Sequence, residues 1–171
     1  ETLTMLMPAL IMGNTVLFKP PRQGVLLHFP LLEAFRDCFP PGVVNTVFGR
    51  GEQVVHPLMA TGKIDVLAFI GSSRVADSLK KQHPKPHRLR CVLGLEAKNA
   101  AIVLKDADLV PTVAECVLGA LSYNGQRCTA LKILWVQREV ARPFLDKLVK
   151  TVSALRCGMP WEAGVGITPL L

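Results

Sequence analysis

The sequence predicts an α/β fold with a parallel sheet. Short apolar runs, rich in β-branched and aromatic residues, alternate with longer segments of helical periodicity along most of the 171 residues. Glycine, proline and asparagine mark the connections, which are only a few residues long. This alternation is typical of right-handed βαβ units, whose parallel strands are buried on both faces. We therefore expect the strands to be almost wholly apolar and buried.

In the first half of the chain, strand and helix alternate without interruption. A helix over Glu1–Met12 stops at Gly13-Asn14, and a helix that begins near Leu26 stops at Pro40-Pro41-Gly42. The other elements expected in this half are strands at Thr15–Lys19, Val43–Phe48 and Val66–Ile70 and helices at Glu52–Ala60 and Ser73–Lys81.

The second half has the same α/β pattern. Its expected elements are apolar runs at Cys91–Leu95 and Ala100–Leu104, a helix at Val110–Leu121, a strand at Lys132–Val136 and a helix at Glu139–Leu155. Trp135 and an apolar stripe on the last helix are expected in the core. The stripe consists of Leu145, Leu148, Val149 and Val152. The segment His83–Arg88 carries two prolines and marks the expected domain boundary or crossover, so we divide the chain into residues 1–90 and 91–171.

The composition favours a globular protein with a sizeable core. Half of the residues (50%) are hydrophobic and 19% are charged, which excludes intrinsic disorder. A chain of this size removes roughly 70% of its unfolded surface from water. The longest apolar stretches, such as Met5–Met12, fall well short of the ~18 residues that a membrane helix needs. We expect neither a membrane-spanning helix nor a membrane partner.

The cysteines and histidines do not form a metal-binding pattern. The five cysteines are an odd number without a Cys-x-x-Cys pair, which fits neither a disulfide framework nor a zinc site. The four histidines are scattered along the chain. We therefore expect no metal and a reducing compartment, the cytoplasm.

The positive charge is not concentrated in a way that predicts nucleic-acid binding. The 20 Lys+Arg and 13 Asp+Glu give a net charge of +7, but the basic residues are spread along the chain. One cluster, over residues 80–90, contains two prolines and no aromatic residue. Since bases stack on aromatic side chains, we expect a solvated connection here and no nucleic-acid partner.

Cys128 is a candidate nucleophile in the segment Gly125-Gln126-Arg127-Cys128. The permanent charge of Arg127 favours the thiolate of the adjacent Cys128. Cys91 and Cys116 lie in apolar runs, which would raise their thiol pKa. The alternative is that Cys128 is a small core residue, as an isolated cysteine most often is.

A second candidate site lies where the strand over Val66–Ile70 is followed by Gly71-Ser72-Ser73. The start of a helix directly after a buried strand offers backbone N–H groups and a positive dipole end to a phosphate. The alternative is that a serine only caps the helix. Lys19 lies at the carboxyl end of its expected strand, where open α/β sheets bind ligands, although a lysine there is usually only solvated.

Five segments together resemble the aldehyde dehydrogenase superfamily in order and spacing. They are Phe18-Lys19-Pro20-Pro21, Phe39–Asn45, Phe69–Ser72, Gly94–Asn99 and Gly125–Ala130. The resemblance covers the whole chain and is greatest to the NADP-dependent, non-phosphorylating glyceraldehyde-3-phosphate dehydrogenase branch. It implies a doubly wound, Rossmann-like part of the cofactor-binding domain in residues 1–90 and the start of an α/β catalytic domain in residues 91–171. The chain begins with Glu1 and would be a fragment from the middle of the family's polypeptide.

The resemblance implies covalent catalysis by Cys128. Its thiolate would attack the aldehyde carbon to give a thiohemiacetal and then a thioester, and its backbone N–H would form one arm of an oxyanion hole. Arg127 looks like the arginine that helps to hold the substrate phosphate in this branch. Where the family has the glutamate that activates the deacylating water, this chain has Gly94. Glu96 lies two residues later and would replace that glutamate only with a shift of the strand or the pocket.

The resemblance also implies a cofactor site in residues 1–90. Lys19 would hold the adenosine ribose, Gly49 would allow close approach of the adenosine end, and Gly71-Ser72 would meet the pyrophosphate. Arg22, three residues after the ribose-binding lysine, would favour a 2′-phosphate and hence NADP, with NAD as the alternative. The family's turn usually ends in glycine, and this chain has Ala76 there.

The function expected from this resemblance is oxidation of an aldehyde, glyceraldehyde 3-phosphate in the first place, to the carboxylic acid with NADP. One alternative is a dehydrogenase for another aldehyde. The other is a catalytically silent homologue that binds nucleotide, which the glycine at position 94 motivates. The full-length protein would be a homo-oligomer, and the isolated fragment would be inactive.

Overall fold

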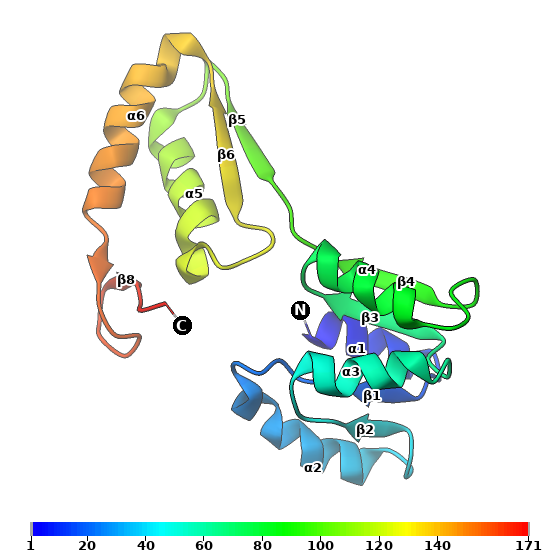
Figure 1. The fold of residues 1–171 in the computed structure, drawn as a ribbon. Helices are drawn as coiled ribbons and strands as arrows, with labels where there is room; N and C mark the ends of the chain where they lie inside the picture. The colour runs from blue at the N-terminus through cyan, green and yellow to red at the C-terminus, as the bar shows by residue number, and fades with distance from the viewer. Residues whose placement is uncertain (1, 171) are drawn as a thin grey trace. The chain divides into compact units, whose positions relative to one another are not determined.

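The computed structural model describes residues 2–170. The chain divides into two compact units, of which the first ends at Gly94 and the second begins at Leu95. Each unit is an arrangement of helices and short parallel strand pairs (Figure 1). The α/β pattern predicted from the sequence is confirmed. Among the described residues, none of the helices is both long and apolar enough to cross a membrane.

The first unit contains two parallel strand pairs, β1 with β2 and β3 with β4. Its elements in chain order are α1 (Thr2–Ile11), β1 (Val16–Phe18), η1 (Val25–His28), α2 (Phe29–Cys38), β2 (Val44–Thr46), α3 (Gly51–Ala60), β3 (Val66–Ile70), α4 (Ser73–Gln82) and β4 (Arg90–Gly94). The segment His83–Arg88 is the crossover from α4 to β4, so it lies inside this unit. The assignment of the unit to cofactor binding stays a prediction.

Two apolar clusters hold the first unit together. Leu6 of α1, Phe18 of β1 and Phe35 of α2 form one cluster. Met59 of α3, Leu67 of β3 and Leu79 of α4 form the other. Each cluster joins a strand to the two helices that pack on it, which is how α/β units bury one side of their strands.

The second unit is built on the parallel pair of β5 with β6. Its elements are β5 (Asn99–Val103), α5 (Leu109–Leu121), η2 (Ser122–Gly125), β6 (Leu131–Val136), α6 (Arg138–Ser153), β7 (Arg156–Cys157) and β8 (Val165–Ile167). Figure 1 shows α5 and α6 on one side of the β5–β6 pair. The core between them consists of Val103, Val113, Cys116 and Phe144. β7 and β8 form a further parallel pair.

The expectation that the strands are buried on both faces is wrong for the described residues. In β3, Leu67 is buried, whereas Val66 and Ile70 are each 43% exposed. On β5 and β6, Ile102 is 72% and Trp135 is 63% exposed, so Trp135 is not a core residue. The physical reason is that successive side chains of a strand point to opposite faces, and α5 and α6 lie on only one side of the β5–β6 pair (Figure 1).

The apolar stripe of α6 also differs from the expectation. Leu148 packs against the core of the second unit, but Leu145, Val149 and Val152 are exposed. The fully buried residue of this helix is Phe144. The face that α6 buries is centred on Val140, Phe144 and Leu148, so Leu145, Val149 and Val152 lie to one side of it.

Candidate active site

Cys128 lies in an exposed loop between η2 and β6. We name residues 122–130 the cysteine loop. The alternative that Cys128 is a core residue is wrong, because the buried cysteine is Cys116. Burial, and then the negative charge of Glu115, raises the pKa of the Cys116 thiol. Cys91, which we expected in an apolar environment, is exposed.

Side chains from β5 and β6 hold the backbone of the cysteine loop. The Asn99 side-chain amide donates to the carbonyl oxygens of Cys128 at 2.6 Å and Ala130 at 3.1 Å. The Lys132 ammonium donates to the carbonyl oxygens of Arg127 at 3.1 Å and Ala130 at 2.9 Å. The carbonyls of Arg127 and Cys128 are therefore bound to the strand pair. The sequence analysis did not identify Asn99 or Lys132, since no local pattern marks a side chain that binds a distant loop.

Arg127 is exposed and stacks on an aromatic ring of the same loop. Its guanidinium carbon lies 4.9 Å from the centroid of the Tyr123 ring, within the range of a cation–π contact. Within the described residues, no hydrogen bond or ion pair engages the guanidinium. Its N–H donors are thus available to an anion, as the predicted role requires.

A hollow of about 200 Å³ lies beside Arg127. Its lining consists of Glu115, Leu118, Gly119, Ser122, Arg127, Thr129 and Ala130. The carboxylate of Glu115 makes this hollow unfavourable for a phosphate, and Cys128 does not line it. We therefore do not assign the substrate to it.

The chain enters the cysteine loop through a left-handed turn. Tyr123, Asn124 and Gly125 have φ angles of 53°, 58° and 68°. This conformation costs an L-residue roughly 1–2 kcal/mol, less for asparagine and nothing for glycine. The described structure has no other non-glycine residue with positive φ. Backbone strain of this kind persists only where surrounding contacts hold it.

Glu96 lies in the connection between β4 and β5 and is exposed. β4 ends at Gly94, so the strand alternation on which we based the relation between positions 94 and 96 does not extend to Glu96. A Cβ built on Gly94 would meet Ile70 Cγ1 at 3.4 Å and Met5 Cε at 3.9 Å, both ordinary contacts. Position 94 thus has room for a Cβ.

The predicted cofactor residues lie in the first unit, at the ends of its strands. Phe18 of β1 pairs with Thr46 of β2 in a parallel register, so the segments that follow these two strands leave the same edge of the pair. Lys19 follows β1 and is half-buried, with its ammonium donating to the carbonyl of Pro20 at 3.1 Å. Arg22 is exposed in the turn before η1.

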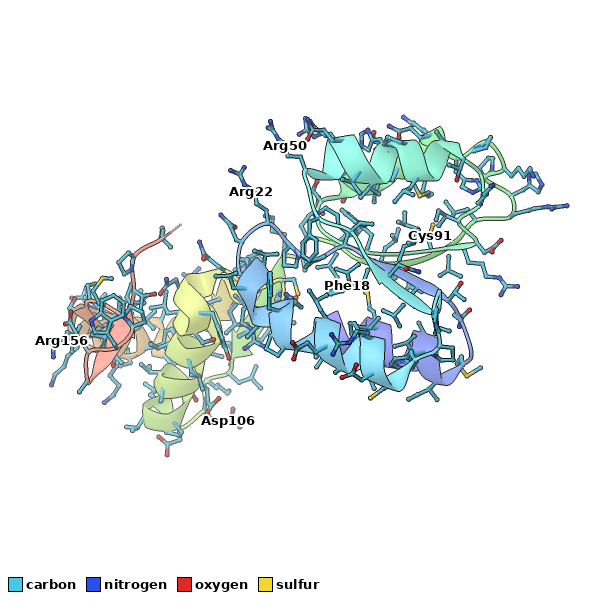
Figure 2. All side chains as sticks on the ribbon, turned by 90° about the horizontal axis from the view of Figure 1, so that it is seen from below. Phe18, Arg22, Arg50, Cys91, Asp106 and Arg156 are labelled. Carbon is cyan, nitrogen blue, oxygen red and sulfur yellow. The ribbon has the colours of Figure 1, made fainter. Side chains whose placement is uncertain are left out.

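Arg50 is a cation at this edge that the sequence analysis missed. Arg22 follows the last residue of β1 by four positions, and Arg50 follows the last residue of β2 by the same number. Figure 2 shows both side chains extending outward from these segments. Within residues 2–170, neither guanidinium makes a hydrogen bond or an ion pair. We name Lys19, Arg22 and Arg50 the basic edge. Two unengaged guanidinium groups fit an anionic ligand such as a nucleotide phosphate.

Gly49 and Gly71 are required by the packing of the first unit. Gly49 has φ +138°, and a Cβ there would lie 2.7 Å from Val54 Cγ2. At Gly71, a Cβ would lie 2.5 Å from the ring of Phe69. Either substitution would force neighbouring atoms to move, with or without a cofactor.

Ser72 is the N-cap of α4. Its hydroxyl accepts a hydrogen bond from the Val75 N–H at 3.4 Å, so this serine does cap the helix. Its role toward a pyrophosphate is a prediction that the cap does not contradict. Ala76 is buried on the inner face of α4. No group of three or more potential ligands that could hold a metal ion occurs in the part of the chain that the structure describes.

The comparisons with known proteins agree on one family. A profile of the aldehyde dehydrogenase family matches residues 2–171. An NADP-dependent glyceraldehyde-3-phosphate dehydrogenase from Streptococcus equinus is 39% identical over 165 residues, which are 96% of this chain and 34% of that protein. One with the same name from Scenedesmus vacuolatus is 34% identical, over 97% of this chain and 70% of that protein. The chain spans about a third of the length of most of the curated relatives it matches.

Solved structures give the same result. NADP-dependent glyceraldehyde-3-phosphate dehydrogenase from Bacillus halodurans C-125, complexed with NADP, has a TM-score of 0.85 and 39% identity, over 95% of this chain and 34% of that one. HpcC from Thermus thermophilus has a TM-score of 0.90 and 32% identity, over 96% of this chain and 32% of that one. From the match along its length and the shared fold, the chain belongs to the aldehyde dehydrogenase family.

Proposed function

We propose that this chain is part of an NADP-dependent dehydrogenase that oxidises glyceraldehyde 3-phosphate to the carboxylic acid. The observation that carries the proposal is the exposed Cys128 in a loop bound to the strand pair, next to an Arg127 whose guanidinium makes no hydrogen bond or ion pair within the described residues. Three of the proteins named above are called NADP-dependent glyceraldehyde-3-phosphate dehydrogenase, which supports the choice of substrate and cofactor.

Cys128 is the proposed nucleophile. Its thiolate adds to the aldehyde carbon, and its backbone N–H stabilises the negative charge that develops on the carbonyl oxygen. Arg127 binds the phosphate of the substrate through its N–H donors. Loss of a hydride and a proton converts the thiohemiacetal into a thioester, and attack by water then releases the acid and restores the thiol.

The first unit is the proposed cofactor-binding part. NADP, when bound, supplies the acceptor for the hydride. Lys19 binds the adenosine ribose and Arg22 the 2′-phosphate, while the cap at Ser72 places the start of α4 toward the pyrophosphate. Gly49 and Gly71 keep the backbone free of side chains at the positions where the nucleotide approaches.

Deacylation is the step on which an alternative function depends. We propose that Glu96 activates the water, because it is the carboxylate nearest in sequence to the family's glutamate position. The alternative is a catalytically silent, nucleotide-binding homologue, and the observation that favours it is Gly94 at that position. A cytoplasmic location, a homo-oligomeric state and a different aldehyde substrate are further proposals that rest on family membership.

A burst experiment on the intact protein tests the proposed function. Excess glyceraldehyde 3-phosphate and NADP are mixed with enzyme, and NADPH is followed by absorbance from the first turnover onward. We expect a burst of one NADPH per active site, and its abolition by Cys128→Ser. Cys157→Ser, which alters another exposed thiol of the second unit, is the matched control and retains the burst.

Each outcome has a distinct meaning. A burst followed by many turnovers supports the dehydrogenase. A single burst without turnover indicates that deacylation is lost. A wild type that forms no NADPH supports the silent homologue, and a Cys128→Ser variant with full activity would overturn the assignment of the nucleophile.

A further inference from the structure

The left-handed turn before Cys128 is bound to a distant part of the second unit. The Asn124 side-chain amide donates to the Thr168 carbonyl at 3.0 Å and to the Thr168 hydroxyl at 2.9 Å. In return, the Thr168 N–H donates to the side-chain oxygen of Asn124 at 3.0 Å. One side chain thus makes three hydrogen bonds to a residue 44 positions away. We name this arrangement the Asn124–Thr168 clamp.

Position 124 requires a left-handed backbone and a side chain that both donates and accepts hydrogen bonds, and asparagine provides both. It tolerates the left-handed conformation better than most residues, and its short amide offers a donor and an acceptor at once. Tyr123 beside it is less suited to positive φ, and the clamp supplies contacts that hold the strained pair in place. Gly125 completes the turn without strain.

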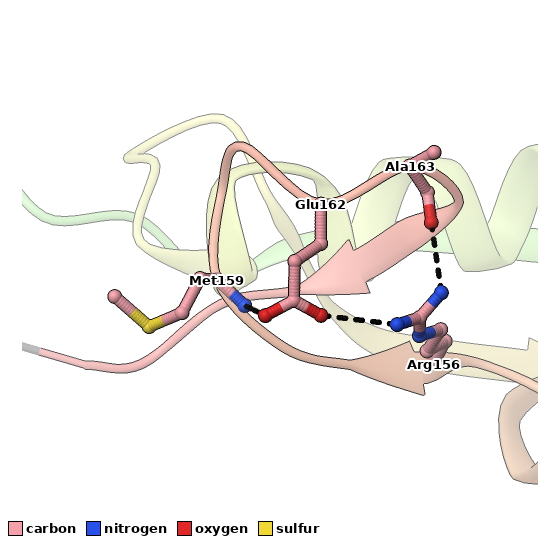
Figure 3. Close-up of polar contacts among 4 residues, drawn as sticks. All are labelled: Arg156, Met159, Glu162 and Ala163. Atoms are coloured by element: carbon pink, nitrogen blue, oxygen red, sulfur yellow. Dashed lines mark hydrogen bonds and ion pairs between the residues drawn. The ribbon is translucent and has the colours of Figure 1, made fainter.

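The Thr168 side of the clamp is itself fixed. Thr168 directly follows β8, which pairs with β7. The Arg156 guanidinium closes the connection between these strands by donating to the Glu162 carboxylate and to the Ala163 carbonyl, each at 3.0 Å (Figure 3). The same carboxylate accepts from the Met159 N–H at 3.3 Å. Because the ion pair is exposed, the strand pairing and these main-chain contacts matter more than the charges.

The clamp and the strand contacts hold the cysteine loop at separate points. Asn99 and Lys132 bind the carbonyls of residues 127, 128 and 130. The clamp binds the entrance of the loop, four residues before Cys128. With the exit alone fixed, the strained turn could relax to an ordinary conformation and shift the backbone that leads to Cys128 and Arg127.

We propose that Asn124 is a positioning residue for the nucleophile, acting through the left-handed turn with Thr168 as its partner. The inference rests on the proposed function, since it concerns the attack by Cys128. A misplacement of the reacting sulfur by about 1 Å is enough to slow an attack about 100-fold. The clamp should therefore affect the rate of acylation and leave cofactor binding unchanged.

The test uses Asn124→Gly in the intact protein. Glycine adopts positive φ freely, so this variant removes the clamp without adding strain. We expect the rate constant of the NADPH burst at saturating substrate to fall about 10- to 100-fold. The KM for NADP should stay within about twofold. A merely structural role would lower the amplitude of the burst, which counts active molecules, and leave its rate constant unchanged.

Thr168→Val gives a graded second test, also in case Asn124→Gly fails to fold. It removes the hydroxyl acceptor and keeps both main-chain contacts, so the burst rate constant should fall less, by about three- to tenfold. Thr151→Val in α6 is the matched control, because it removes a hydroxyl that donates only to the Lys147 carbonyl at 2.9 Å. This control should keep the wild-type rate constant.

The outcomes separate this inference from the proposed function. A wild-type protein whose burst disappears in Cys128→Ser supports the function whatever the clamp does. In that protein, a wild-type burst rate constant in Thr168→Val, or in a folded Asn124→Gly, overturns the positioning role. A rate constant that falls in the order wild type, Thr168→Val, Asn124→Gly supports it.

Discussion

The basic edge of the first unit and the cysteine loop of the second unit are both exposed, but they are held in different ways. On the basic edge, Arg22 and Arg50 have unengaged guanidinium groups, and the backbone is set by strand register and by Gly49. In the cysteine loop, the side chains of Asn99 and Lys132 bind carbonyls of the loop backbone, and the Asn124 side chain of the loop itself binds Thr168.

This difference corresponds to two physical tasks. A flexible arginine can find a phosphate and bind it through several donors, so availability of the charge matters more than its exact placement. A nucleophile must reach its target with a geometry fixed to a fraction of an ångström. The comparison therefore predicts that substitutions on the basic edge alter affinity and cofactor preference, and that substitutions around the cysteine loop alter rate constants.

The substitution Glu96→Gln has the largest expected effect. It tests whether a residue outside the cysteine loop also determines a rate constant of the reaction. If Glu96 activates the water, Glu96→Gln leaves the NADPH burst intact and lowers steady-state turnover by ~10² to 10⁴-fold. Pre-steady-state and steady-state NADPH formation measure the two effects separately.

Position 94 supplies the control for Glu96. Because a Cβ at this position makes only ordinary contacts, Gly94→Glu should restore turnover in the Glu96→Gln background. If burst and turnover fall together in Glu96→Gln, the residue has a structural role and the water is activated elsewhere.

Arg22→Glu tests the basic edge, with an intermediate effect. A charge-assisted hydrogen bond to the 2′-phosphate contributes roughly 1.5–3 kcal/mol, so we expect a preference for NADP of at least about tenfold in the wild type and its loss in the variant. The measurement is kcat/KM with NADP and with NAD. Arg88→Glu, the same charge change in the crossover before β4, should leave the ratio unchanged. A wild type that prefers NAD would refute the role of Arg22.

Ser72→Ala has the smallest expected effect and tests whether the start of α4 contributes to cofactor binding. Loss of the N-cap costs about 1 kcal/mol of folding stability, measurable as a lower midpoint in urea. Asp108→Ala removes the cap of α5 in the second unit, where the carboxylate accepts from the Val110 N–H at 3.1 Å, and should cost a similar amount. If Ser72→Ala also weakens NADP binding far more than Asp108→Ala does, Ser72 contributes to the cofactor site as well as to the cap.

Local sequence patterns predicted the elements well. β3 occupies Val66–Ile70 as expected, because an apolar run between turn residues already contains the information for a strand. The capping role of Ser72 was one of the two alternatives considered, since a serine before a helix acts on the next turn of the same helix. The elements that sequence reasoning missed, β7 and β8, are two and three residues long and have no periodicity to detect.

Long-range features could not be predicted. The exposure of Trp135 depends on which face of the β5–β6 pair the helices cover, and a local stretch of sequence does not determine that face. Asn99 and Asn124 reach their partners across 29 and 44 residues. Cys128 could be recognised through its neighbours Gly125 and Arg127, whereas the residues that hold its loop could not. Sequence reasoning therefore gave a hypothesis for the chemistry and missed the contacts that hold the cysteine loop.

The exposed face of the β5–β6 pair affects the self-association of the chain in solution. Ile102 and Trp135 are partners in the strand register, so two large apolar side chains lie next to each other in water. An apolar sheet face of this kind favours association, while the net charge of +7 keeps copies apart at low ionic strength. When the 171-residue chain is prepared by itself, added salt should therefore promote self-association by screening the repulsion and leaving the apolar attraction in place.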